Sequence, residues 1–93
     1  METALLDSGE ELSVLERVIV SPGLGVFTPH EPSEVTTEGE IVRAGQEIGT
    51  VSVSGHTMPV LSPFTGFLMG LLAHPGERVR DGQPVAWLRA VAA

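Results

Sequence analysis

Short runs of β-branched and other apolar residues, separated by glycine, proline and serine, follow one another along this 93-residue chain from residue 17 onward. Runs this short, bounded by turn-forming residues, are typical of β-strands. Eleven glycines and seven prolines supply tight turns between them. The pattern therefore predicts an all-β fold with eight strands, at residues 17–21, 25–27, 41–42, 48–53, 58–62, 66–72, 78–79 and 84–89.

The same unit occurs twice in the chain. Val-Ser-Pro at residues 20–22 recurs as Leu-Ser-Pro at 61–63, and Gly-Glu-x-Val-Arg-x-Gly-Gln at 39–46 recurs at 76–83. The offset is 41 between the prolines (63 − 22) and 37 between the later glycines (82 − 45), so the first copy holds four extra residues. These extra residues lie within residues 28–37. An internal repeat indicates that one structural unit has been duplicated.

Each repeated position has a physical reason. Proline ends a strand because it has no N–H to donate, and Gly25 and Gly66, three residues after the prolines, permit a bend or a close approach of backbones. Val42 and Val79 are predicted to point inward. The glycines at 45 and 82 supply the positive φ of a tight turn before the next strand.

Neither copy is large enough to bury its apolar face alone, so the copies must interlock about a pseudo-twofold axis. We therefore expect a flattened eight-strand barrel-sandwich of two four-strand halves, joined by one central hairpin. This domain is assigned to residues 17–91. Residues 1–16 form an acidic lead that we expect to be mobile, although 10–16 are also compatible with a short helix or an extra strand.

Charge excludes several classes of function. The net charge is −7, and residues 1–16 carry five of the twelve carboxylates but none of the five arginines. No basic stripe is left to bind phosphates, so we do not expect nucleic-acid binding. The chain has no cysteine and no apolar run long enough to span a membrane. We expect a cytoplasmic protein that does not bind membranes.

The paired motifs resemble those of the biotinyl/lipoyl domain family, the barrel-sandwich hybrid, over residues 17–90. Within that family the chain is most similar to the biotin carboxyl carrier protein of acetyl-CoA carboxylase. That similarity implies a Pro-rich thumb after the first Pro-x-x-Gly unit, near the tip of the central hairpin. The thumb-like insertion of this chain is residues 28–37, with Pro29, His30, Glu31 and Pro32 as candidate contact residues.

The chain departs from the family at the hairpin tip. The resemblance places the attachment lysine eight residues before the second Ser-Pro proline, where this chain has Gly55, and the sequence contains no lysine at all. Ligases join biotin or lipoate to a lysine amine, so we expect no covalent cofactor. The candidate interaction residues at the tip are Ser54, Gly55, His56, Thr57 and Met58.

Histidine is the commonest metal ligand, so the histidines require a test. The resemblance would bring His30 and His56 together, with Glu31 as a third ligand, whereas His74 belongs to the second copy. Separate solvated histidines are the simpler interpretation, and we predict no metal site. Nor does the chain contain a Gly-x-Ser-x-Gly elbow, a cysteine or a tyrosine, and we expect no enzymatic activity.

Trp87 is the single tryptophan. Strand alternation puts it on one face with Val85 and Arg89, and Ala86 and Leu88 on the other. A half-buried core residue is the simpler interpretation, and an anchor for a protein interface is the alternative.

Two functions remain. The first is a non-biotinylated, non-lipoylated carrier-like domain that acts as an interaction module or accessory subunit of a biotin-dependent carboxylase system. Its partners would be carboxylase or carboxyltransferase subunits, and the chain would be a monomer or a weak homodimer. The alternative is a small-ligand or metal-binding protein that uses a cleft between the insertion and the hairpin tip.

Overall fold

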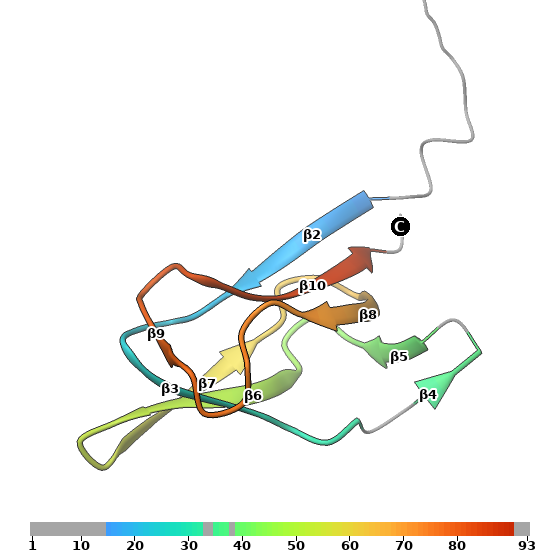
Figure 1. Ribbon diagram of the computed structural model, residues 1–93. Coiled ribbons are helices and arrows are strands. Elements are labelled where there is room, and N and C mark those ends of the chain that lie inside the picture. Colours follow the sequence, from blue (N-terminus) through green and yellow to red (C-terminus); the bar gives the residue numbers. More distant parts are fainter. Residues whose placement is uncertain (1–14, 33–34, 38, 91–93) are drawn as a thin grey trace, which may run out of the picture.

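The computed structural model describes residues 15–32, 35–37 and 39–90 (Figure 1). This part of the chain contains strands and no helix. The strands are β2 (Leu15–Val20), β3 (Gly25–Pro29), β4 (Val35–Thr36), β5 (Gly39–Val42), β6 (Glu47–Val53), β7 (His56–Leu61), β8 (Gly66–Leu71), β9 (Arg78–Val79) and β10 (Pro84–Ala90).

All eight predicted strands are present, with small differences at their ends. The first begins at Leu15 rather than Arg17, so the end of the acidic lead belongs to β2. Residues 1–14 and 91–93 lie outside the described residues, as do the expectations made for them. No helix among the described residues is long and apolar enough to cross a membrane.

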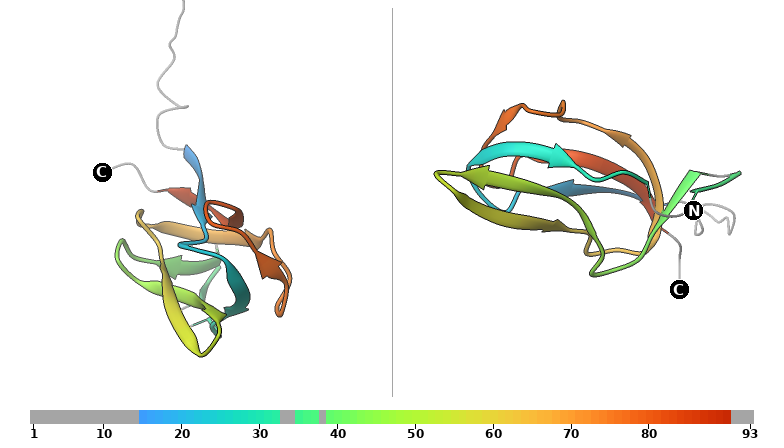
Figure 2. Two further views of the ribbon diagram at one scale, coloured as in Figure 1. Left: turned by 90° about the vertical axis from the view of Figure 1, so that its left-hand side faces the viewer. Right: turned by 90° about the horizontal axis from the view of Figure 1, so that it is seen from below.

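The strands form two stacked antiparallel sheets that do not close into a barrel (Figures 1 and 2). One sheet has the order β2-β10-β8-β5-β4, and the other has the order β7-β6-β3-β9. Each sheet therefore contains strands from both copies of the repeat. The expected interlocking of two halves is confirmed.

The pseudo-twofold relation holds for individual residue pairs. The strands β2, β10, β8 and β5 of the first sheet correspond, in this order, to β7, β6, β3 and β9 of the second sheet. The pair Arg89–Phe67 then corresponds to Ser52–Val26. One irregularity matches as well, because β10 skips one residue opposite β2 where β6 skips one residue opposite β7. The register shift between β10 and β8 has no counterpart between β6 and β3.

Because of its β-bulge, the last strand does not follow the strict alternation of faces that the sequence predicted. The extra residue of β10 is Val85, and both Val85 and Ala86 are fully buried. A bulge places two consecutive residues opposite one partner and so interrupts the period of two. Trp87 is half-buried, as predicted, but it pairs with Val18 and Gly70 on the outer face rather than joining the core.

Backbone hydrogen bonds lock each Ser-Pro corner to the Gly-Gln turn of the other copy. Ser21 donates its N–H to the carbonyl of Gln83 at 2.8 Å and accepts from the N–H of Gly82 at 2.9 Å. Ser62 donates to the carbonyl of Gln46 at 2.9 Å and accepts from the N–H of Gly45 at 2.7 Å. Both glycines have positive φ, as the sequence predicts.

The two corner serines are 1% exposed and use their hydroxyl groups as well. Ser21 Oγ donates to the carbonyl of Gly23 at 2.6 Å, and Ser62 Oγ donates to that of Phe64 at 2.7 Å. Because their polar groups are satisfied, these serines sit in the interior without an unpaired donor.

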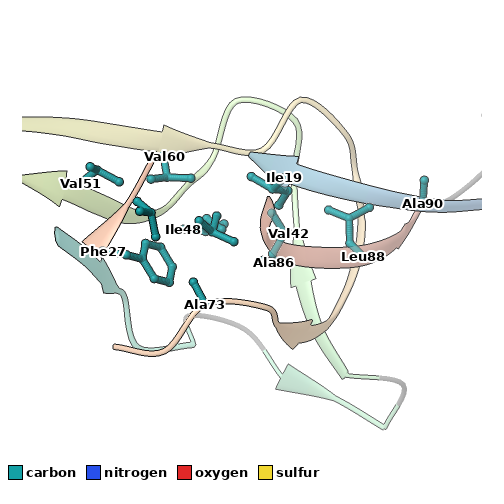
Figure 3. Packing of buried hydrophobic residues seen from close by; sticks show 12 residues of the cluster. Ile19, Phe27, Val42, Ile48, Val51, Val60, Ala73, Ala86, Leu88 and Ala90 are labelled. Atoms are coloured by element: carbon teal, nitrogen blue, oxygen red, sulfur yellow. The ribbon is translucent and has the colours of Figure 1, made fainter. Parts of the chain in front are cut away.

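The core lies between the two sheets (Figure 3). Val42 and Val79 are completely buried, as predicted, and Phe27 is the largest side chain in the interior. Most of the other members are aliphatic, and they come from both copies. The cluster is Ile19, Phe27, Val42, Ile48, Val51, Val60, Ala73, Val79, Val85, Ala86, Leu88 and Ala90.

Strand β4 was not predicted. It pairs with β5 through Val35–Glu40 and Thr36–Gly39, and it extends the first sheet by one strand. Because β4 is formed by the insertion at residues 28–37, the second copy has no equivalent of it.

Replacing Gly66 by alanine tests the close approach between β8 and β10. A Cβ at Gly66 would lie 2.4 Å from the carbonyl oxygen of Arg89, which is backbone that cannot move aside. We expect Gly66→Ala to lower the free energy of unfolding by about 3 kcal/mol, measured by urea denaturation. Gly76→Ala is the control, because a Cβ there meets nothing within 4 Å. Its positive φ should cost only about 1 kcal/mol. Equal losses in the two variants would contradict the close approach.

Candidate functional site

The central hairpin ends in a two-residue turn. Strands β6 and β7 are joined by Ser54 and Gly55, and Val53 and His56 are the last pair before the turn. The φ angles of Ser54 and Gly55 are 50° and 80°. Two consecutive positive φ angles are the signature of a type I′ turn, which matches the twist of the flanking strands.

The tip projects into solvent with a small polar surface. Ser54, Gly55, His56 and Thr57 are exposed, and a Cβ at Gly55 would meet nothing within 4 Å. The hydroxyls of Ser52 and Thr57 lie 3.1 Å apart across the two strands. The tip therefore offers hydroxyl groups and one imidazole, and it carries no amine.

Met58 belongs to the body of the domain rather than to the exposed tip. It is half-buried and packs against the core, and a Cβ at Gly23 would lie 2.7 Å from its Cε. Its counterpart in the first copy is Arg17, whose guanidinium lies 5.6 Å from the ring centre of Phe64. The two contacts close equivalent corners of the sandwich with different chemistry.

The insertion does not lie near the tip, so that expectation was wrong. Pro29 pairs with Gly49, and the N–H of His30 donates to the carbonyl of Ile48 at 2.9 Å. These partners belong to the start of β6, whereas the tip follows its end. The hairpin tip and β4 accordingly lie at opposite ends of the molecule (Figures 1 and 2).

The same arrangement keeps the histidines apart. His30 Nε2 contacts Glu47 Oε2, a pair that the sequence did not suggest because 17 residues separate the two. Glu47 is the first residue of β6, and Val53, which pairs with His56, is the last. At the rise per residue of an extended strand, these two ends lie about 20 Å apart. His30 and His56 therefore do not share a site.

The described ranges give no support to the ligand-binding alternative. They hold no group of three histidine, aspartate or glutamate side chains close enough to bind one metal ion. Glu31 and Pro32 are exposed beside His30, far from the tip. Nor do the described residues enclose a cleft between the insertion and the hairpin.

The carboxyl group of Glu77 has a shifted pKa. The N–H of His74 donates to Glu77 Oε1 at 2.8 Å, and this bond lowers the pKa of Glu77. A donor bond from Gln83 Nε2 and the nearby His74 ring act in the same direction, against partial desolvation. Because the pKa of Glu77 is lower in the folded state, its ionised carboxylate stabilises the fold at pH values above the unfolded pKa. This stabilisation is lost as the pH falls through the folded pKa. The group belongs to the turn before β9 and has a structural role.

Comparison with known proteins gives likeness in structure only. No family model and no curated protein matches the chain. A single-chain, multi-domain long-chain acyl-CoA carboxylase is 19% identical with a TM-score of 0.65, and the match covers 84% of this chain and 7% of that one. The Kluyveromyces lactis urea carboxylase is 25% identical with a TM-score of 0.66, covering 95% of this chain and 7% of that one.

The chain shares its fold with a small part of these carboxylases. A succinylglutamate desuccinylase/aspartoacylase from Rhodobacter sphaeroides is also similar, with 25% identity, a TM-score of 0.57, and coverage of 92% of this chain and 24% of that one. The fold thus occurs in chains with different activities. Because a fold does not determine function, the choice must come from the site.

A lysine placed at the tip tests whether the hairpin retains the geometry of an attachment site. We expect Gly55→Lys to be biotinylated when it is co-expressed with a biotin protein ligase, because the side chain would project into open space. Its positive φ should cost about 1 kcal/mol. Intact-mass spectrometry measures the modification.

Gly82→Lys is the matched control for this variant. Gly82 has the same φ of 80° and equally open surroundings, but it lies in the turn before β10. It should remain unmodified. Modification of both variants would show that the ligase does not recognise the tip, and modification of neither would contradict the equivalence of Gly55 with the attachment position.

Proposed function

We propose that this chain is a carrier-type domain without an attachment residue, which acts as an accessory or interaction subunit in a biotin-dependent carboxylase system. The observation that carries the proposal is the exposed Ser54-Gly55 turn, which stands where the resemblance expects a lysine, in a chain that has no lysine. Without an amine, the tip serves as a contact surface.

Two further observations support this proposal. The domains of similar fold in the acyl-CoA carboxylase and the urea carboxylase are small parts of long chains, at 7% of each. In such chains the domain works together with the other parts of the carboxylase, and we propose the same kind of contact for this domain. The tip also satisfies the geometric needs of a docking element, because the β6–β7 pairing holds it rigidly while its side chains stay exposed.

The proposal predicts a complex that depends on the tip. We expect the purified chain to bind the biotin carboxylase or the carboxyltransferase subunit of the same organism in biolayer interferometry. His56→Ala should weaken the complex about tenfold, the effect of losing one well-placed interface side chain. The chain itself should carry no biotin in intact-mass spectrometry after co-expression with the ligase.

His30→Ala is the matched control, because His30 is also an exposed histidine but lies at the opposite end of β6. It should bind as tightly as the unaltered chain. A larger loss with His30→Ala than with His56→Ala would move the contact to the insertion. Failure to bind either subunit would contradict the proposed function.

A further inference from the structure

The outer face of the first sheet carries a group of exposed apolar side chains. Residues paired directly across antiparallel strands point to the same side of a sheet. Trp87 pairs with Val18, and Arg89 pairs with Glu16 on one side and Phe67 on the other. Ile41 continues this row beside Phe67. The outer face is defined here as Val18, Ile41, Phe67 and Trp87, with the charged neighbours Glu16 and Arg89.

These side chains lie open on the described part of the molecule. Val18 is 49% exposed, and Ile41, Phe67 and Trp87 are half-buried. Trp87 lies over Gly70, where a Cβ would come within 3.2 Å of its Nε1. The indole therefore packs closely over the glycine and leaves part of its surface exposed. Val20 and Met69 extend the apolar area at its margins, at 44% and 39% exposure.

The internal symmetry of the chain shows that the fold does not require this apolar face. Thr50 occupies in the second sheet the place that Trp87 occupies in the first. In the same way, Ser52 replaces Arg89, and Arg78 replaces Ile41. Pro59 and Val26 stand in place of Val18 and Phe67, so the equivalent face is apolar at only two of the four positions. The larger apolar surface of the first sheet indicates a face that is covered by something.

We propose that this outer face binds the same face of a second copy of the chain. A contact about a twofold axis brings one surface against itself, so the surface must be self-complementary. Glu16 and Arg89 are directly paired neighbours of opposite charge, and neither forms an ion pair with another described residue. When the twofold axis passes between these two neighbours, Arg89 of each copy meets Glu16 of the other.

Charge elsewhere favours this face over other surfaces for self-association. The chain carries a net charge of −7, so two copies repel each other over most orientations. The outer face combines apolar residues with one charge of each sign, so it adds no local repulsion to that of the net charge. A partner with strong charge of one sign would instead select a face of the opposite sign.

The size of the face sets the strength of the contact. Four strands spaced about 4.8 Å apart, with about six residues each, cover roughly 400 Å². A standard interface buries about 800 Å² on each partner. The dimer is therefore weak and depends on protein concentration. It stands apart from the proposed docking of the hairpin tip, because the tip joins β6 and β7 of the other sheet.

Sedimentation equilibrium of the full chain tests the proposal. We expect the mass to rise from the monomer value of 9.8 kDa toward twice that value as the concentration increases from about 10 µM to about 1 mM. Trp87, the single tryptophan, should shift its emission to shorter wavelength over the same range. A monomer at every concentration would overturn the proposal.

Two variants take their new residues from the equivalent face. Trp87→Thr and Phe67→Val introduce the residues found at the matching positions of the other sheet, Thr50 and Val26. Both should remain monomeric, with folding checked by circular dichroism. Thr50→Val is the control, because it alters the other sheet and should dimerise like the unaltered chain. Dimerisation of Trp87→Thr and Phe67→Val would place the contact elsewhere.

Charge reversal distinguishes a twofold contact from any other. Arg89→Glu puts two carboxylates on the face and Glu16→Arg puts two guanidinium groups there, so each variant alone should associate at least tenfold more weakly. An equimolar mixture should recover a dimer, because each charge then meets its opposite. No recovery on mixing would overturn the twofold arrangement.

Changes in the NMR signals of residues 1–14 in dilute Trp87→Thr would identify that segment as the occupant of the outer face instead and would equally overturn the proposal.

Discussion

The reciprocal hydrogen bonding between Ser-Pro corners and Gly-Gln turns is the constraint on which the structure depends. Ser21 and Ser62 are buried, and each exchanges two backbone bonds with the turn of the other copy. Because each sheet contains strands of both copies, separating the copies would break these bonds and expose the apolar core to water. Neither copy is therefore a folding unit alone, and the strands of both are fixed in both sheets.

Symmetry also separates the residues that the fold requires from those it leaves free. The inward Val42 and Val79 and the turn glycines Gly45 and Gly82 are the same in both copies, because burial and positive φ allow few alternatives. The outer faces differ position by position. The turn at Ser54 and Gly55 joins the two copies and so has no counterpart within either. Function in such a domain is expected at the unpaired turn and on the unlike faces.

The repeat predicted the fold because each motif constrains the backbone locally, and two copies of a half-barrel have few ways to pack. Three features escaped that reasoning. The bulge at Val85 is invisible to an argument that assumes strict alternation. Strand β4 depends on pairing with β5 rather than on its own two residues. The position of His30 beside Glu47 is set by the register of β3 on β6, which a single sequence does not encode in any local pattern.

The hairpin tip has an unusual backbone conformation at Ser54. Ser54 is the only described residue other than glycine with a positive φ, at 50°. This conformation costs an ordinary L-residue about 1–2 kcal/mol relative to glycine. The pairing of β6 with β3 and β7 holds the hairpin so firmly that it tolerates this cost. A type I′ turn requires positive φ at both central residues, so the connection between the strands demands this conformation of Ser54. What the fold leaves free is the side chain at that position, and a serine there puts an exposed hydroxyl at the end of the tip.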